Sequence, residues 1–303
     1  MVQNKTKTEW GGQWTEQKLN AFEKYVKAYL TIMNVHRDKY REKWKLIYLD
    51  AFAGSGTRKT EIPPKQQQRL AGFYIEPDEC AIYRGAAERV VAIEIPGFDY
   101  YYYYYYFVDK DTKASDDLQK RLRKDNTDDP RFQFRHGDAN IYIRKLGNHL
   151  QQNKHYKALA LLDPFGMQVN WEALTHLQDT STDLWVLVPS GMIIGRLLKK
   201  DGTLMHPERL TSYFGLSEKE ILARFYAEKT KKTLFGDETT QSKIEKPTRR
   251  IAEIYAERLC GIFRHVAKPM VLRNSRNVPI YHFVFASNNA DAKKIANAIT
   301  GKD

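Results

Sequence analysis

Cysteine is nearly absent from this sequence, since Cys80 and Cys260 are the only two among 303 residues. Two cysteines so far apart provide no disulfide framework, and they lack the spacing of zinc ligands. Their scarcity is typical of a reducing compartment. We therefore expect a cytoplasmic protein without a structural metal.

Long apolar runs are missing as well. No stretch approaches the roughly 20 apolar residues that span a membrane, and the opening MVQNKTKTEW lacks the apolar centre of a signal peptide. Hydrophobic residues make up 42% and charged residues 28% of the chain, which excludes a disordered class. The length suits one large domain, or one domain carrying an insert, with no membrane partner.

Basic residues are in excess, with 49 Lys and Arg against 37 Asp and Glu and a net charge of +12. A surplus of this size favours a polyanionic partner such as RNA or DNA. A basic surface that only maintains solubility explains the same number. The charge alone leaves both interpretations open.

Short apolar runs alternate with helical stretches along most of the chain. Apolar residues at helical spacing predict a first helix from Trp14 to about Asn34, after a polar arm at 1–13. Strands alternating with helices predict right-handed crossovers and a parallel sheet. The five predicted strands are 46–52, 103–109, 132–138, 158–163 and 183–189. A tyrosine run, 100–106, overlaps the second, and strand packing is the favoured explanation over a platform for bases.

The alternation stops at residue 190. Residues 190–265 hold 15 basic and 10 acidic residues and are predicted to be a mostly helical insert. Two further strands, 269–273 and 280–287, suit an antiparallel hairpin, and a helix over 290–299 closes the chain. The pattern predicts an α/β, Rossmann-like class I methyltransferase fold with a mostly parallel seven-stranded sheet. Its core comprises 14–189 and 266–303, and the insert is a candidate region for binding a substrate or partner.

An acidic residue stands at or next to the end of each of the first four strands. These residues are Asp50, Asp109, Asp138 and Asp163. Parallel sheets bind ligands beyond the carboxyl ends of their strands. The four acids therefore predict a ligand site along one edge of the sheet.

The segment DAFAGSGT, residues 50–57, closes the first strand and leads toward a helix. Gly54 and Gly56 permit a tight turn and close approach of a ligand to the backbone. A following helix N-terminus would offer N–H groups to the carboxylate of a bound amino acid. The segment resembles the D-x-F-x-G-x-G-T element of amino-group methyltransferases, which bind S-adenosylmethionine (SAM); a purely structural glycine turn is the alternative. The candidate residues are Asp50, Ala51, Phe52, Gly54, Ser55, Gly56 and Thr57.

Asp109 and Asp138 are candidates for holding an adenosine. A carboxylate after the second strand, Asp109, can accept both ribose hydroxyls, with Asp111 as a weaker choice. After the third strand, Asp138 can accept from the adenine amino group while the N–H of Ala139 meets a ring nitrogen. Solvated loop carboxylates are the alternative at both places.

The segment LLDPFG follows the fourth strand. It resembles the D/N-P-P-F/Y element of methyltransferases that modify exocyclic amines of bases. By that resemblance Asp163 accepts from the target amine, Pro164 sets the geometry and Phe165 stacks on the base, ahead of Gly166. Holding the amine in this way lowers the barrier through orientation, without a metal. The D-P-F-G variant also resembles tRNA N2-dimethylguanosine methyltransferases, so guanine is as good a target as adenine; a structural turn is the alternative.

Seven segments in order resemble the three-Cys-motif partner family (TcmP) over about residues 14–299. They are WTEQKLNAFEKYVKAYL, LIYLDAFAGSG, FVDKD, GDAN, LALLDPFGMQVNWEAL, DLWVLVPSGMIIGRLL and YHFVFASNNADAKKI. The resemblance implies a bacterial setting and a protein partner with a three-cysteine motif, similar to radical-SAM enzymes. It also adds Thr15 and Lys18, since the family's W-T-x-x-K precedes the first strand and Lys18 would meet the methionine carboxylate. A helix-capping Thr15 and a surface Lys18 are the alternatives.

Together these features favour a SAM-dependent methyltransferase acting on an exocyclic amine of a base in RNA or DNA. One alternative is a methyltransferase of small molecules or proteins. Another is a SAM-binding or scaffold subunit whose three-Cys-motif partner carries out the chemistry. A nuclease is disfavoured because the acids stand at cofactor positions rather than in a metal-binding cluster.

Overall fold

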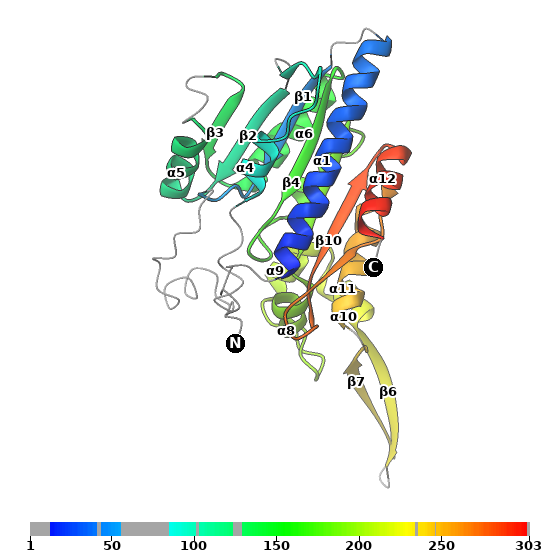
Figure 1. The fold of residues 1–303 in the computed structure, drawn as a ribbon. Helices are drawn as coiled ribbons and strands as arrows, with labels where there is room; N and C mark the ends of the chain where they lie inside the picture. Colours follow the sequence, from blue (N-terminus) through cyan, green and yellow to red (C-terminus); the bar gives the residue numbers. More distant parts are fainter. Residues whose placement is uncertain are drawn as a thin grey trace, which may run out of the picture.

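A twisted eight-stranded sheet forms the centre of the molecule (Figure 1). The computed structural model describes residues 13–40, 44–55, 85–100, 103–123, 129–233, 236–245 and 247–301. The predicted polar arm lies outside this range except for Gln13, as do Gly56, Thr57 and Cys80.

The strand order is β3-β2-β1-β4-β5-β10-β8, with β9 also pairing with β10. The first five strands are mutually parallel, and β10 runs antiparallel to β5. Their bounds are β1 Lys45–Asp50, β2 Tyr103–Asp109, β3 Phe132–His136, β4 Tyr156–Leu162 and β5 Thr182–Val188. The remaining strands are β8 His265–Val266, β9 Met270–Arg273 and β10 Pro279–Ser287.

This order, with one reversed strand beside β5, is that of the Rossmann-like class I methyltransferase fold, which confirms the predicted fold class. The predicted antiparallel hairpin is also present as β9 and β10, joined through Asn277 in a left-handed conformation (φ 59°). The sheet has eight strands rather than seven because the two-residue strand β8 pairs with the far end of β10. So short a strand has no periodicity from which it could be predicted.

Helices cover both faces of the sheet, which explains why its central strands are apolar throughout instead of alternating. Every residue of β5 is buried, and so are the last five of β4. One face packs against helices α1 Gln13–Tyr40, α4 Ala86–Val91, α5 Thr112–Leu122 and α12 Ala290–Thr300 (Figure 1). The other packs against α6 Ala139–Gln152, α7 Trp171–Thr175, α9 Pro207–Phe214, α10 Glu218–Phe225 and α11 Pro247–Leu259.

The tyrosine run forms a buried strand. Tyr103 and Tyr105 are buried, while the alternate residues Tyr104 and Tyr106 are half-buried. Tyr105 stacks on Phe132 of β3, with ring centroids 4.7 Å apart and planes within 9°. The run therefore packs within the sheet, as expected, and Asp109 ends the strand; residues 101–102 lie outside the described range.

The insert differs from its prediction. After a π-helical turn, η2 Ser190–Ile194, and the short helix α8 Gly195–Leu197, it contains α9, α10 and α11. Residues Tyr226–Thr233 (β6) and Gly236–Lys243 (β7) form an antiparallel hairpin, so the helical prediction is wrong there. The segment is rich in threonine, whose β-branched side chain favours strands. The hairpin projects from the rest of the structure (Figure 1).

Candidate active site

The four predicted acids meet along one edge of the sheet. Strands β3, β2, β1 and β4 are neighbours, and their register pairs Asp109 with His136 and Asp50 with both Phe107 and Leu161. Each carboxylate therefore lies within about two residues of the same level. Along the edge the order is Asp138, Asp109, Asp50 and Asp163.

The glycine turn is anchored to the end of β2. Asp109 accepts hydrogen bonds from the N–H of Gly54 through one oxygen and of Asp111 through the other, both at 2.8 Å. Gly54 has a φ of 62°, a left-handed conformation that disfavours a side chain. The turn and the predicted ribose acid thus form one rigid unit, in which Ala51 and Ser55 are buried and Phe52 is half-buried.

Asp111 has a different role from the one considered for it. Its carboxylate accepts from the N–H of Ala114 at 3.1 Å and caps the N-terminus of α5. This leaves Asp109 as the acid at the end of β2 for the proposed ribose contact.

Asp138 caps α6. One oxygen accepts from the backbone N–H of Asn140 (2.8 Å) and from its side chain (2.9 Å), while the other pairs with Lys110 at 2.9 Å. Burial acts to raise the pKa of Asp138, but the bonds from Lys110 and Asn140 together lower it. Ala139 is the first residue of α6, so its N–H has no partner within the helix.

Asp163 and Lys18 form a buried ion pair between the end of β4 and helix α1. Their side chains are 5% and 1% exposed, and Lys18 Nζ donates to Asp163 Oδ2. Burial raises the pKa of Asp163, and the charge and hydrogen bond of Lys18 oppose this rise. The surface interpretation of Lys18 is therefore wrong, because α1 packs its polar residue into the core.

Two buried oxygens, one on Asp163 and one on α1 near Lys18 in the sequence, have no hydrogen-bond partner among the described residues: Asp163 Oδ1 and Thr15 Oγ1. Thr15 is the third residue of α1, so it does not occupy the capping position considered for it. A buried, unpaired polar atom is destabilising unless something else satisfies it. Asp163 Oδ1 is thus a buried acceptor for which the described residues supply no donor.

Asp50 stands between Asp109 and Asp163. It accepts two long hydrogen bonds, both 3.3 Å, from the Tyr48 hydroxyl and the Phe52 N–H. Burial, followed by the nearby charge of Asp163, raises the pKa of Asp50 to about 7. A buried carboxyl with a strongly raised pKa, at the carboxyl ends of parallel strands, is a typical feature of functional sites.

The loop after Asp163 presents an aromatic ring. Phe165 is 41% exposed, and its N–H donates to the side-chain oxygen of Gln168 at 2.9 Å. Asn140 in turn donates to the carbonyl of Gln168 at 2.9 Å, which ties this loop to α6. A Cβ at Gly166 would lie 3.4 Å from Ile193, an ordinary contact, so the glycine is not required by crowding there.

Asn140 and Gln168 were not singled out in the sequence. Asn140 belongs to the GDAN segment and Gln168 follows DPFGM, so both were adjacent to predicted site residues. Their roles depend on the approach of two loops 28 residues apart, which no local pattern reveals.

Much of the insert's basic charge is engaged in internal contacts. Lys243 donates to the carbonyls of Gly195 (2.5 Å) and Leu198 (2.6 Å). Arg249 and Arg250 pair with glutamates on their own helix, α11. The number of basic residues in the insert therefore overstates how many of them are available to a polyanion.

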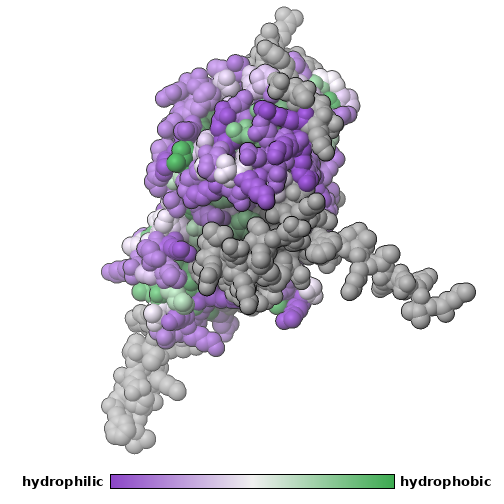
Figure 2. Space-filling model, turned by 90° about the vertical axis from the view of Figure 1, so that its left-hand side faces the viewer, coloured by the Kyte–Doolittle hydropathy of each residue, from purple (hydrophilic) through white to green (hydrophobic). Residues whose placement is uncertain are grey.

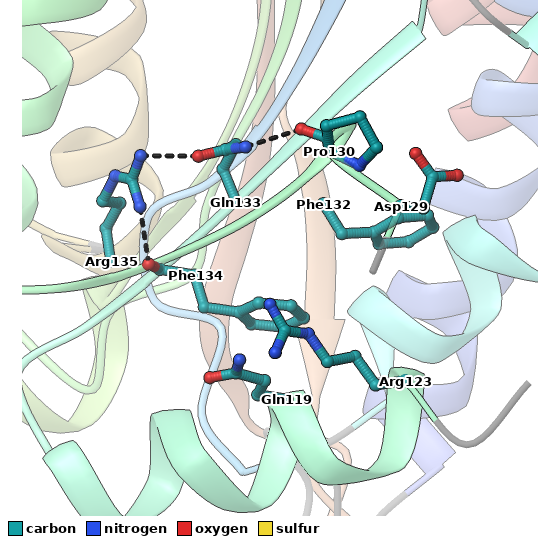
Figure 3. A pocket seen from close by; sticks show the side chains of 8 residues that line it. All are labelled: Gln119, Arg123, Asp129, Pro130, Phe132, Gln133, Phe134 and Arg135. Carbon is teal, nitrogen blue, oxygen red and sulfur yellow. Dashed lines mark hydrogen bonds between the residues drawn. The ribbon is translucent and has the colours of Figure 1, made fainter. Parts of the chain in front are cut away.

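Two cavities in the described part of the structure lie away from the four carboxylates. One, of about 300 Å³, lies beside the amino-terminal end of β3 and the end of α5, where Arg123, Asp129 and Phe134 line it (Figure 3). Another, of about 570 Å³, involves Ile93, Tyr100 and Arg131. Both cavities are lined by residues that precede the carboxyl ends of the strands. Neither therefore lies at the edge of the sheet where the four carboxylates stand. The described residues on the side facing the viewer in Figure 2 are mainly hydrophilic.

Among the described residues, no group of three or more His, Cys, Asp or Glu is placed to hold a metal ion. None of the helices in that part of the chain combines the length and apolar character that a membrane span requires.

Comparison with known proteins gives remote likenesses only. No family model and no curated protein matches the chain. A Legionella pneumophila protein of family model DUF519 is 12% identical, with 93% of this chain and 99% of that chain covered and a TM-score of 0.41. Trm1 from Pyrococcus horikoshii, solved with S-adenosyl-L-methionine, is 14% identical, with 92% and 57% covered and a TM-score of 0.34.

The plantazolicin methyltransferase BamL, solved with SAH, is 9% identical, with 91% of this chain and 89% of that chain covered and a TM-score of 0.27. At such identities and scores these likenesses carry no functional conclusion. Membership of the three-Cys-motif partner family stays a prediction.

Proposed function

We propose that this protein is a SAM-dependent methyltransferase that modifies an exocyclic amine of a nucleic-acid base. The observation that carries the proposal is the row of carboxylates, Asp138, Asp109, Asp50 and Asp163, at the carboxyl ends of adjacent parallel strands. It ends at a buried acceptor, Asp163 Oδ1, that lacks a partner in the described chain.

The residues present fit the cofactor. Asp138 and Ala139 would hold the adenine, Asp109 the ribose, and the glycine turn from Asp50 the methionine end. Asp109 offers a carboxylate held by two backbone N–H groups, which leaves further lone pairs on its oxygens for hydroxyl donors. The predicted contributions of Gly56 and Thr57 lie outside the described residues. When bound, SAM supplies an electrophilic methyl group.

For Lys18 the structure suggests an additional function. The resemblance assigned it to the methionine carboxylate, whereas its ammonium is bonded to Asp163. We propose that Lys18 keeps Asp163 ionised and holds its Oδ2, so that Oδ1 remains oriented to accept from the substrate. Thr15 Oγ1 is a second buried group close in sequence that a ligand would satisfy.

The target amine would donate to Asp163 Oδ1 and to a backbone carbonyl next to Pro164, with Phe165 against the base. Accepting those hydrogens directs the nitrogen lone pair toward the methyl group, and orientation of this kind supplies several kcal/mol of the barrier. The N–CH₃ bond forms as the S–CH₃ bond breaks, and the amine then loses one proton. The base must be single-stranded or turned out of its stack before it reaches this edge.

A nucleic-acid substrate is supported by the net charge of +12 and by the exposed ring of Phe165. Charge-driven binding would weaken strongly between about 50 and 200 mM salt. Affinity that does not change over this range would exclude the polyanion.

The decisive test is Asp163→Asn, assayed with methyl-labelled SAM on tRNA, rRNA and DNA. The variant should still bind SAM, measured by calorimetry, but transfer no label. Asp183→Asn is the matched control, since Asp183 is also buried but lies at the start of β5, bonded to Tyr25 (2.7 Å) and Ser287 (2.6 Å). Label transfer by Asp163→Asn at the wild-type rate would remove the mechanism.

The projecting hairpin favours a second role for the insert, namely holding the substrate or a protein partner. β6 and β7 pair only with each other among the described strands. The partner expected from the family resemblance is a three-Cys-motif protein similar to radical-SAM enzymes. If the purified chain binds SAM but transfers label only after the three-Cys-motif protein is added, the protein is a SAM-binding scaffold subunit and not an independent enzyme. Label that appears on a small molecule or a protein would favour a methyltransferase of those substrates.

A further inference from the structure

We propose that Asp50 recognises the positive charge on the sulfur of SAM, and that a proton replaces that charge on Asp50 when the sulfur is uncharged. This inference rests on the proposed function and concerns how the same site distinguishes SAM from its demethylated product, SAH.

The order of the carboxylates locates the charge. Adenine is assigned to the end of β3, ribose to β2 and the target amine to β4. SAM carries its sulfur between the ribose and the transferred methyl group. The strand between β2 and β4 is β1, and the acid at its end is Asp50.

The buried charges do not balance on their own. Asp50 is 2% exposed and Asp163 4%, and among the described residues one ammonium, Lys18, accompanies them. With both carboxyls ionised, this cluster carries one excess negative charge away from water. An uncompensated buried charge is costly, so the cluster favours either a proton or a bound cation.

Asp50 is the member best able to take that proton. Lys18 donates to Asp163 and not to Asp50, whose hydrogen-bond donors among the described residues are the Tyr48 hydroxyl and the Phe52 N–H, both at 3.3 Å. The groups that face Asp50 are Tyr48 on its own strand, Asp163 beyond β4 and Asp109 at the end of β2. The carboxylates of Asp163 and Asp109 disfavour a negative charge on Asp50, and the Tyr48 hydroxyl offers it only a long hydrogen bond. Burial, followed by the charge of Asp163, raises the pKa of Asp50 to about 7.

A cation beside Asp50 would lower its pKa, so SAM binding near neutral pH would expel the proton. Because Asp50 is half protonated at a pH equal to its pKa, the release there approaches about half a proton. SAH, whose sulfur is neutral, would bind without release. After methyl transfer the sulfur is neutral, and Asp50 would take up a proton again. The protonated Asp50 carries no charge, so it would no longer favour the cationic SAM over SAH.

The test is isothermal titration calorimetry of SAM and SAH in two buffers of different ionisation enthalpy, such as phosphate and Tris. The dependence of the apparent enthalpy on the buffer reports protons released. We expect release with SAM and with an analogue that carries a protonated amine in place of the sulfonium, and none with SAH. Repeated from about pH 5.5 to 8.5, the preference for SAM over SAH should rise by up to about tenfold per pH unit below neutrality and level off above it.

Two variants assign the effect. Asp50→Asn should abolish both the proton release and the pH dependence of the SAM preference. Asp109→Asn, on the neighbouring strand, should weaken SAM and SAH alike and retain the release. If Asp50→Asn does not fold, the wild-type pH series alone decides the question.

The outcomes separate the two proposals. SAM that binds with no proton release and a pH-independent preference over SAH would overturn this inference and leave the methyltransferase proposal standing. Failure of both ligands to bind the wild type would overturn both.

Discussion

Replacing Lys18 with Met tests whether the ion pair with Asp163 is truly removed from water. The substitution keeps the length of the side chain and removes its charge, so packing around α1 changes little. It leaves a buried carboxylate whose counter-ion has gone. Breaking a buried pair in this way typically costs about 3–5 kcal/mol in the free energy of unfolding.

The loss of stability depends on pH, because the Asp163 carboxylate that has lost its counter-ion can be neutralised by binding a proton. With Lys18 removed, burial raises the pKa of Asp163 further, since Lys18 is what opposes the rise. Protonating a carboxyl of ordinary pKa costs at most about 4 kcal/mol at pH 7 and about 1.5 kcal/mol at pH 5. A carboxyl whose folded-state pKa is raised binds more protons folded than unfolded, so stability falls as pH rises. The loss in Lys18→Met should therefore be larger at pH 7 than at pH 5.

Urea unfolding followed by circular dichroism at the two pH values measures this difference. Lys27→Met is the matched control on the same helix, because Lys27 is exposed and pairs with Glu23 at 2.8 Å. An exposed pair of this kind contributes about 0.3–0.5 kcal/mol. The double variant Lys18→Met, Asp163→Asn should recover part of the loss, since no buried charge remains.

A loss in Lys18→Met below about 1 kcal/mol, or one equal at both pH values, would contradict the reasoning. Either result would mean that water reaches Asp163, and its unpaired oxygen would no longer be evidence for a substrate donor.

Three further predictions concern positions outside the carboxylate row. Gly215→Ala should destabilise by several kcal/mol in a thermal or urea melt, because φ is 61° and the new Cβ would lie 2.2 Å from Trp171. Ser190→Ala removes the partner 2.6 Å from His282 Nδ1, so it should cost about 1–3 kcal/mol by the same measurement; a loss indistinguishable from zero would mean that the pair is hydrated. Replacing 227–242 by a short Gly-Ser linker should change the free energy of unfolding by less than about 1 kcal/mol and leave SAM binding intact. Weaker retention of nucleic acid by this variant in a filter-binding assay would assign the hairpin to substrate binding.

The strands and their end residues could be predicted because they depend on local pattern. Buried parallel strands are short apolar runs, and acids that end them are visible in the sequence as Asp50, Asp109, Asp138 and Asp163. The sequence does not predict the hairpin β6–β7, because its polar residues show no alternation of apolar and polar positions.

The sequence by itself determined which residues end the parallel strands, and therefore which carboxylates meet along one edge of the sheet. Only the tertiary structure decided what those residues contact. The pairing of Lys18 with Asp163 joins positions 145 residues apart, and Asp111 and Asp138 proved to cap helices. Periodicity records which side of an element is buried, but the partner of a buried charge depends on how separate elements pack. The unpaired oxygen of Asp163 and the raised pKa of Asp50 arise from that packing.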